Sequence, residues 1–251
     1  MLGVILAGPL VCASSQAAND WFDRHVDAIN EPHRPIPSGR MPGRWGLYIA
    51  GIWTAVSLAV SYFLGPWGFA AGAVGLLLAW AYSAPPLRLK MNGWWGNAAC
   101  GLCYEGLAWV TGAAVMLGSQ MPSPKILLIA LMYSVGAHGI MTLNDFKSIE
   151  GDRRMGIASL PVQLGVHGAA RCACIFMILS QCVVVVALFS WGLGVQAGLV
   201  AALVIAQAAL MVQFMINPVA RAIWYSAFGV TIYVAGMMLS AFALRNLGVS
   251  Q

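Results

Sequence analysis

The chain has 251 residues, of which 60% are hydrophobic and only 8% are charged, and its formal net charge is +5. A soluble domain carries about a quarter charged residues, so this composition excludes an ordinary soluble enzyme. The lack of any basic tract excludes a nucleic-acid-binding chain. What remains is an all-α, polytopic helical membrane bundle. At about 20 apolar residues per crossing, it has room for about eight transmembrane helices in a single domain over residues 1–251.

Gly, Pro and charged residues divide the chain into eight apolar segments of suitable length for membrane crossings of about 17–25 residues. In chain order these are 2–22, 46–64, 67–83, 95–117, 125–143, 169–191, 194–214 and 223–243. The opening residues 1–17 are similar to a secretory signal but lack a positively charged start. Cleavage there would also separate them from Asn19 and Asp20, which begin the most informative motif. We therefore expect a membrane helix there.

The charged residues are distributed unevenly between the two sides of these segments. If the first span runs from outside to inside, the outer side holds only Lys125 and Arg245, and the inner side holds the other 11 basic residues. This asymmetry predicts that the inner loops face the cytoplasm. Seven of the eight acidic residues are also expected at the inner face of the membrane. The exception is Glu105, which lies within a span.

The first acidic cluster begins with Asn19. At 100° per residue, Asn19, Asp20, Asp23 and Asp27 occupy an arc of about 100° on one helix face. Carboxylates this close repel one another unless a cation neutralises them. Mg²⁺ is a suitable cation, because it prefers oxygen ligands and commonly joins carboxylates to substrate phosphates. The alternative interpretation is a solvated helix end.

The second cluster spans residues 144–154. If helical geometry persists, Asp145, Ser148 and Asp152 share a face and Glu150 points away; a break at Gly151 would keep Glu150 as a candidate. Two opposing Asp faces would hold Mg²⁺ ions on a diphosphate, with basic side chains bonded to its oxygens. The expected catalytic and metal-binding residues are Asp20, Asp23, Asp27, Asp145 and Asp152. The expected diphosphate-binding residues are Asn19, Arg34, Arg40, Arg88, Lys90, Asn144, Lys147 and Arg153, and cytoplasmic orientation alone explains about half of the basic ones.

The pairing of Asn-Asp-x-x-Asp-x-x-x-Asp with a second Asp motif resembles the UbiA superfamily of intramembrane prenyltransferases. The segments 30–40, 82–90, 93–97, 104–106 and 144–152 extend the resemblance to the chlorophyll and bacteriochlorophyll synthases, over essentially the whole chain. The superfamily's second motif is usually Asp-x-x-x-Asp, which falls on positions 148 and 152, but Ser148 stands at the first. Asp145, one turn earlier, is therefore the candidate for that ligand.

The resemblance implies esterification of the propionate of (bacterio)chlorophyllide a by geranylgeranyl or phytyl diphosphate, with Mg²⁺ as cofactor. Mg²⁺ and basic side chains stabilise the leaving diphosphate. The propionate is already ionised at neutral pH, so its attack on the allylic carbocation needs no general base.

It also implies a bacterial inner or photosynthetic intracytoplasmic membrane, with the active site facing the cytoplasm. Membrane proteins that make or receive pigment are further candidate partners. Family members have nine membrane helices, with the Asp motif closing the second, whereas here the motif begins at residue 19. We therefore expect that the family's first span is missing, through a mis-chosen start codon or a truncation.

Several alternatives remain open at this point. His138 is either an axial ligand of the tetrapyrrole magnesium or a packed, hydrogen-bonded histidine, and Tyr104 and Glu105 are candidates for the tetrapyrrole pocket or for helix–helix hydrogen bonding. Another UbiA-type enzyme, acting on a quinone precursor or haem, would share the Asp clusters. A non-enzymatic pigment-binding membrane protein would explain the helices but not the two acidic clusters.

Overall fold

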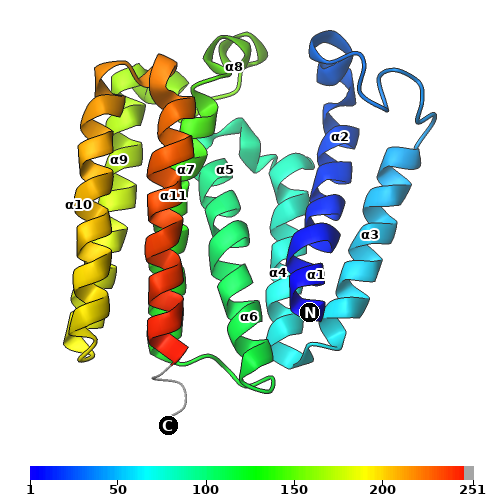
Figure 1. Cartoon of the computed structure of the whole chain (residues 1–251). Helices are drawn as coiled ribbons and strands as arrows, with labels where there is room; N and C mark the ends of the chain where they lie inside the picture. The colour runs from blue at the N-terminus through cyan, green and yellow to red at the C-terminus, as the bar shows by residue number, and fades with distance from the viewer. Residues whose placement is uncertain (246–251) are drawn as a thin grey trace. The chain divides into compact units, whose positions relative to one another are not determined.

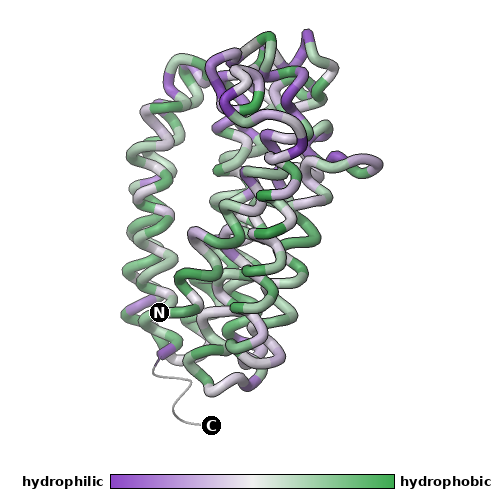
Figure 2. The backbone as a smooth tube through the Cα atoms, turned by 90° about the vertical axis from the view of Figure 1, so that its right-hand side faces the viewer, coloured by the Kyte–Doolittle hydropathy of each residue, from purple (hydrophilic) through white to green (hydrophobic). Residues whose placement is uncertain are grey.

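The computed structural model describes residues 1–245, and this part of the chain is helical with no strand, as expected (Figure 1). The helices are α1 (Leu2–Ile5), α2 (Val11–Asn30), α3 (Trp45–Tyr62), α4 (Gly65–Ser83), α5 (Gly93–Gly101), α6 (Ala108–Met116), α7 (Pro124–Asp145), α8 (Ile149–Met155), α9 (Leu160–Ser190), α10 (Gly194–Ile216) and α11 (Pro218–Arg245). Short π-helical turns at Leu6–Leu10 and Leu102–Leu107 join α1 to α2 and α5 to α6. Hydrophobic residues run along the helices, and hydrophilic residues gather towards helix ends and loops (Figure 2).

Seven helical segments of the described chain are long and apolar enough to cross a membrane. They are Leu2–Ile29, Trp45–Tyr62, Gly93–Met116, Pro124–Asp145, Leu160–Ser190, Gly194–Ile216 and Pro218–Arg245. The remaining expected crossing, 67–83, corresponds to α4, a helix of 19 residues. It falls outside this set because four glycines and two tryptophans lower its mean hydropathy. The expected eight helices are therefore present, but seven of them meet the criteria of length and composition.

Three helices are clearly longer than their apolar segments predict, and one of them is α11, which runs over Pro218–Arg245 where 223–243 was expected. The helix expected over 2–22 continues to Asn30, so the first acidic cluster lies on a continuous helix; the π-helical turn around Pro9 accommodates the proline upstream. The segment expected to start at 169 begins at Leu160, with a kink at Gly165, whose φ is 72°. Gln163 and His167 lower the hydropathy of the first part of this helix, so a hydropathy pattern does not include it.

The chain divides into two compact units, of which the first contains Met1–Lys90 and Leu107–Pro122. Within it α2 packs against α3 and α4, and α4 packs against α6. Leu6, Leu10 and Leu64 form a small buried apolar cluster. A Cβ added at Gly72 would lie only 2.8 Å from the Ser61 Oγ, which shows how closely α3 and α4 approach through small residues.

The second unit contains Met91–Gly106 and the chain from Ser123 onward. Here α7 packs against α5, α9 and α11, and α10 packs against α9 and α11. A polar network lies at the centre of these helices: the Gln181 Nε2 donates to the Gln207 Oε1 over 2.6 Å, and the Gln207 Nε2 donates to the Tyr225 hydroxyl over 3.1 Å. Because hydrocarbon offers no hydrogen bonds, these buried partners join α9, α10 and α11 specifically.

Candidate active site

The first acidic cluster lies near the end of α2, and the helical face predicted for it is confirmed. The loop after α2 turns back, so that Arg34 reaches the carboxylates of Asp20 and Asp27, which lie about two helical turns apart. Its Nη1 lies 3.2 Å from the Asp20 Oδ1 and 3.1 Å from the Asp27 Oδ2. Arg34 also contacts Glu31 through Nε. One guanidinium thus links three carboxylates and relieves part of their mutual repulsion.

Asp23, between these two on the helix face, receives its cations from the segment after α4. The Lys90 Nζ contacts the Asp23 Oδ2, and the Arg88 Nη2 lies 3.4 Å from the Asp23 Oδ1. The Arg88 Nε is buried and has no hydrogen-bond partner in the described part of the chain. Nearby, the Asn19 Nδ2 donates to the Ser83 Oγ over 3.1 Å, which attaches the motif's first residue to the end of α4.

The environment changes the pKa of two of these cations in opposite directions. Burial lowers the pKa of Lys90, whose side chain is 10% exposed, and the hydrogen bond and charge of Asp23 offset only part of that effect. For Arg34, burial also opposes the charged form, but the hydrogen bond to Glu31 and the charge of Asp27 outweigh it and raise the pKa. Arg34 is therefore firmly cationic, and Lys90 holds its proton less tightly than an exposed lysine.

Arg40 does not join this cluster. Its guanidinium donates to the carbonyl of His33 and, over 3.1 Å, to the Ser38 Oγ, so it stabilises the loop that carries Arg34. The expected diphosphate contact of Arg40 stays a prediction.

The second acidic cluster is not one helix. Helix α7 ends at Asp145, a turn follows over 146–148, and α8 carries Glu150 and Asp152. Helical geometry therefore does not persist through the cluster, but the interruption is this turn and not Gly151, which lies inside α8. Since α8 restarts at 149, residues 145 and 152 do not follow one helical face.

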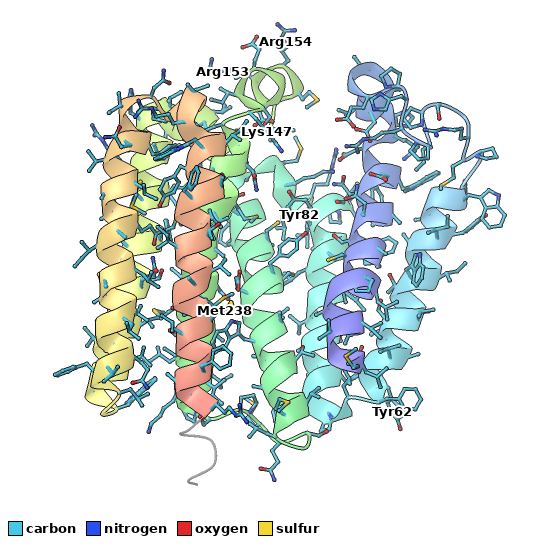
Figure 3. All side chains as sticks on the ribbon, in the orientation of Figure 1. Tyr62, Tyr82, Lys147, Arg153, Arg154 and Met238 are labelled. Atoms are coloured by element: carbon cyan, nitrogen blue, oxygen red, sulfur yellow. The ribbon has the colours of Figure 1, made fainter. Side chains whose placement is uncertain are left out.

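Ser148 connects the two parts of this cluster, because its Oγ contacts both the Asp145 carbonyl, at 3.3 Å, and the Asp152 Oδ2, at 3.1 Å. Asp152 is buried, whereas Glu150 is exposed and pairs with Arg154 over 3.1 Å. Glu150 therefore lies on the exposed side of α8, although the continuous helix assumed in the expectation that it points away is absent. Lys147, Arg153 and Arg154 lie at or next to α8 (Figure 3). Asn144, Lys147 and Arg153 are exposed.

Asp145 is held by a donor from another element: the Asn97 Nδ2 of α5 donates to its Oδ2 over 3.2 Å. Asn97 was not among the expected site residues. The signal that could have identified it is an amide within the apolar run 93–117, directly after two glycines and two tryptophans.

The candidate tetrapyrrole residues lie on the α5–α6 segment and on α7. His138 is buried, its Nε2 lies 3.2 Å from the Trp94 carbonyl oxygen, and its ring stacks on Phe176 with centroids 4.6 Å apart. These contacts match the packed, hydrogen-bonded alternative for His138. Tyr104 and Glu105 lie in the π-helical turn, a local widening that is frequent at functional sites.

Within residues 1–245, no group of three or more His, Cys, Asp or Glu side chains is arranged to hold a metal ion. The chemistry of the donors nevertheless suits Mg²⁺, since this ion usually takes one or two carboxylates together with substrate phosphates and waters. The α2 carboxylates offer oxygen ligands for the ion, and the basic side chains beside them offer donors for the phosphate oxygens.

The sequence is similar to enzymes of pigment synthesis. It is 57% identical over 249 residues to the bacteriochlorophyll synthase 33 kDa chain of Cereibacter sphaeroides, covering 99% of this chain and 82% of that protein. It is 38% identical over 259 residues to the chloroplastic chlorophyll synthase of Oryza sativa, covering 97% of this chain and 66% of that protein.

The fold agrees with solved membrane prenyltransferase structures. A digeranylgeranylglyceryl phosphate synthase matches with a TM-score of 0.77 at 22% identity, over 97% of this chain and 85% of that one. A UbiA homolog from Archaeoglobus fulgidus, bound to GPP and Mg²⁺, matches with a TM-score of 0.70 at 19% identity, over 93% of this chain and 87% of that one. The UbiA prenyltransferase family model matches residues 1–232, and the chain therefore belongs to the UbiA prenyltransferase family.

Proposed function

We propose that this chain is a bacteriochlorophyll or chlorophyll synthase. It would esterify the propionate of (bacterio)chlorophyllide a with geranylgeranyl or phytyl diphosphate and release diphosphate. The observation that carries the proposal is the 57% identity to a bacteriochlorophyll synthase over 99% of the chain. The matched segment includes both acidic clusters, and the family match covers residues of both compact units, which favours one prenyltransferase domain.

The α2 cluster supplies the diphosphate chemistry in this proposal. Bound Mg²⁺ would stabilise the negative charge that develops on the leaving diphosphate. Asp20, Asp23 and Asp27 are the residues that would hold it. Arg88 and Lys90, now paired with Asp23, would also bond to phosphate oxygens, since charge-assisted bonds to phosphate are strong. The unpartnered Arg88 Nε supports this role, because a phosphate oxygen would satisfy it.

In this proposal the second acidic cluster, at residues 144–154, also binds Mg²⁺ and diphosphate. We assign Asp145 and Asp152 as further carboxylates for Mg²⁺, and Asn144, Lys147 and Arg153 as contacts to the diphosphate. The hydrogen bond from Ser148 to Asp152 and the hydrogen bond from Asn97 to Asp145 support a defined geometry for these carboxylates.

The acceptor requires little acid–base chemistry. A propionate is ionised at neutral pH, so it attacks the allylic cation without losing a proton. The apolar helices of the described chain would keep water away from that cation. Tyr104, Glu105 and His138 remain our candidates for contacts to the tetrapyrrole. The positive-inside asymmetry supports a cytoplasmic active site in a bacterial inner or photosynthetic membrane.

The reaction can be tested in membranes that contain the expressed chain. We expect esterified pigment from bacteriochlorophyllide or chlorophyllide with geranylgeranyl or phytyl diphosphate, detected by chromatography, and no prenylated product from an aromatic quinone precursor or haem. Chelation with EDTA should abolish the product, and excess Mg²⁺ should restore it. Product from the quinone precursor or haem, or no esterified pigment from either tetrapyrrole, would reject the proposed acceptor. Activity that survives chelation would reject the role of Mg²⁺.

A further inference from the structure

The segment 93–97 belongs to the sequence resemblance, but none of its residues was among the expected site residues. Helix α5 begins there, with the Asn92 side chain accepting the Trp94 backbone N–H over 2.9 Å at the helix start. Gly93 and Asn97 are four residues apart on α5 and therefore lie on one face of the helix. Both residues are buried.

Gly93 brings the start of α5 against the start of α9. Its backbone N–H donates to the Ala158 carbonyl over 2.8 Å, and the Ala158 N–H donates to the Met91 carbonyl over 2.9 Å. A Cβ at position 93 would lie 2.6 Å from the backbone nitrogen of Leu160. Only glycine permits this approach without movement of the backbone, so the two helix starts are held together directly.

One turn further along α5, the Asn97 side chain reaches the end of α7. It is 8% exposed, and its Nδ2 lies 3.3 Å from the Thr142 Oγ1 and 3.2 Å from the Asp145 Oδ2. Asp145 is therefore held from the start of α5, while the chain after it bends into the turn at 146–148.

We infer that Asn97 is a positioning residue, which orients the Asp145 carboxylate for Mg²⁺-diphosphate; this inference rests on the function proposed above. An ionised carboxylate has about four acceptor positions, so the bond from Asn97 leaves others available. Hydrogen bonds of this kind fix the orientation of a ligating carboxylate, and their loss typically costs 10–100-fold in metal affinity or activity. Gly93 contributes indirectly, because its close contact with the start of α9 fixes the start of α5, which carries Asn97.

The test compares two substitutions in the same buried contact. Asn97→Leu keeps a similar size but removes both hydrogen bonds of Asn97. Thr142→Val removes the other acceptor of Asn97 and leaves its bond to Asp145 in place. We expect Asn97→Leu to raise the Mg²⁺ concentration for half-maximal activity by about 10–100-fold, with a smaller change in the KM of the tetrapyrrole. Thr142→Val should leave both quantities near those of the unchanged protein.

A binding measurement separates positioning from stability. Mn²⁺ binding in the presence of inorganic pyrophosphate, followed by electron paramagnetic resonance on the purified protein in detergent, should weaken by a similar factor in Asn97→Leu. If Thr142→Val shifts the Mg²⁺ dependence equally, or Asn97→Leu shifts neither measurement, the inference is wrong. Asn97→Ala replaces Asn97→Leu if the latter does not fold.

Asp145→Ala distinguishes this inference from the proposed function. If Asp145→Ala weakens Mn²⁺ binding and Asn97→Leu does not, the positioning role fails while the proposed function stands. If Asp145→Ala has no effect on Mn²⁺ binding or on esterification, Asp145 is not a ligand, and the inference fails together with that assignment.

Discussion

Replacing Asp23 by Asn is expected to lower kcat/KM for pigment esterification by at least about a hundredfold, a loss typical of removing one electrostatic group that acts on a developing charge. The substitution changes the shape of the side chain little but removes its charge. Two cations, Lys90 and Arg88, face that charge, and Lys90 is largely buried. The variant therefore loses a proposed Mg²⁺ ligand and leaves a buried ammonium without its counter-ion. Esterified product formed by membranes, normalised to the amount of protein, measures the effect.

Glu150→Gln is the matched control, because it also removes one carboxylate charge from an acidic cluster. Glu150 is exposed and pairs with Arg154 on the surface of α8, and exposed ion pairs contribute about 0–1 kcal/mol. We expect its activity to stay within about twofold of the unchanged protein, in keeping with that small contribution. Comparable activities for Asp23→Asn and Glu150→Gln would contradict the proposed role of the α2 cluster.

Replacing Gly139 by Val is expected to destabilise the second unit by about 1–3 kcal/mol or more, the usual cost of overpacking a well-packed core. A Cβ at this position of α7 would lie 2.5 Å from the Ala173 carbonyl oxygen and 2.8 Å from the Met177 Cγ on α9. The carbonyl belongs to a helix backbone, which cannot move aside like a flexible side chain. The apparent Tm in detergent and the monodisperse fraction in size-exclusion chromatography should both fall.

Gly198→Val on α10 makes the same chemical change in open space, since no atom lies within 4 Å of a Cβ added there. We expect its Tm to remain close to that of the unchanged protein. An equal loss in both variants would indicate a general intolerance of valine for glycine. An unchanged Tm in Gly139→Val would mean that α7 and α9 are not in close contact at this point.

Composition and local spacing were sufficient to predict the membrane helices and the acidic face of α2. Both depend on short-range properties: apolar runs of the length of a bilayer, and the 100° step that places Asp20, Asp23 and Asp27 together. The extent of α2 was predicted less well, because a hydropathy pattern stops at the first charges although the helix continues to Asn30. The interruption at 146–148 was likewise not visible from the positions of glycines.

The partners of the acidic residues depended on the folded chain. Lys90 meets Asp23 across 67 positions of sequence, and Asn97 meets Asp145 across 48. No local pattern encodes such distances, since they arise only when α4 packs beside α2 and α5 packs beside α7. The sequence therefore identified the acidic and basic residues to which we assign the proposed chemistry. The packing of the helices within each unit decided which cation meets which carboxylate, because these contacts form only after distant helices have buried their surfaces against each other.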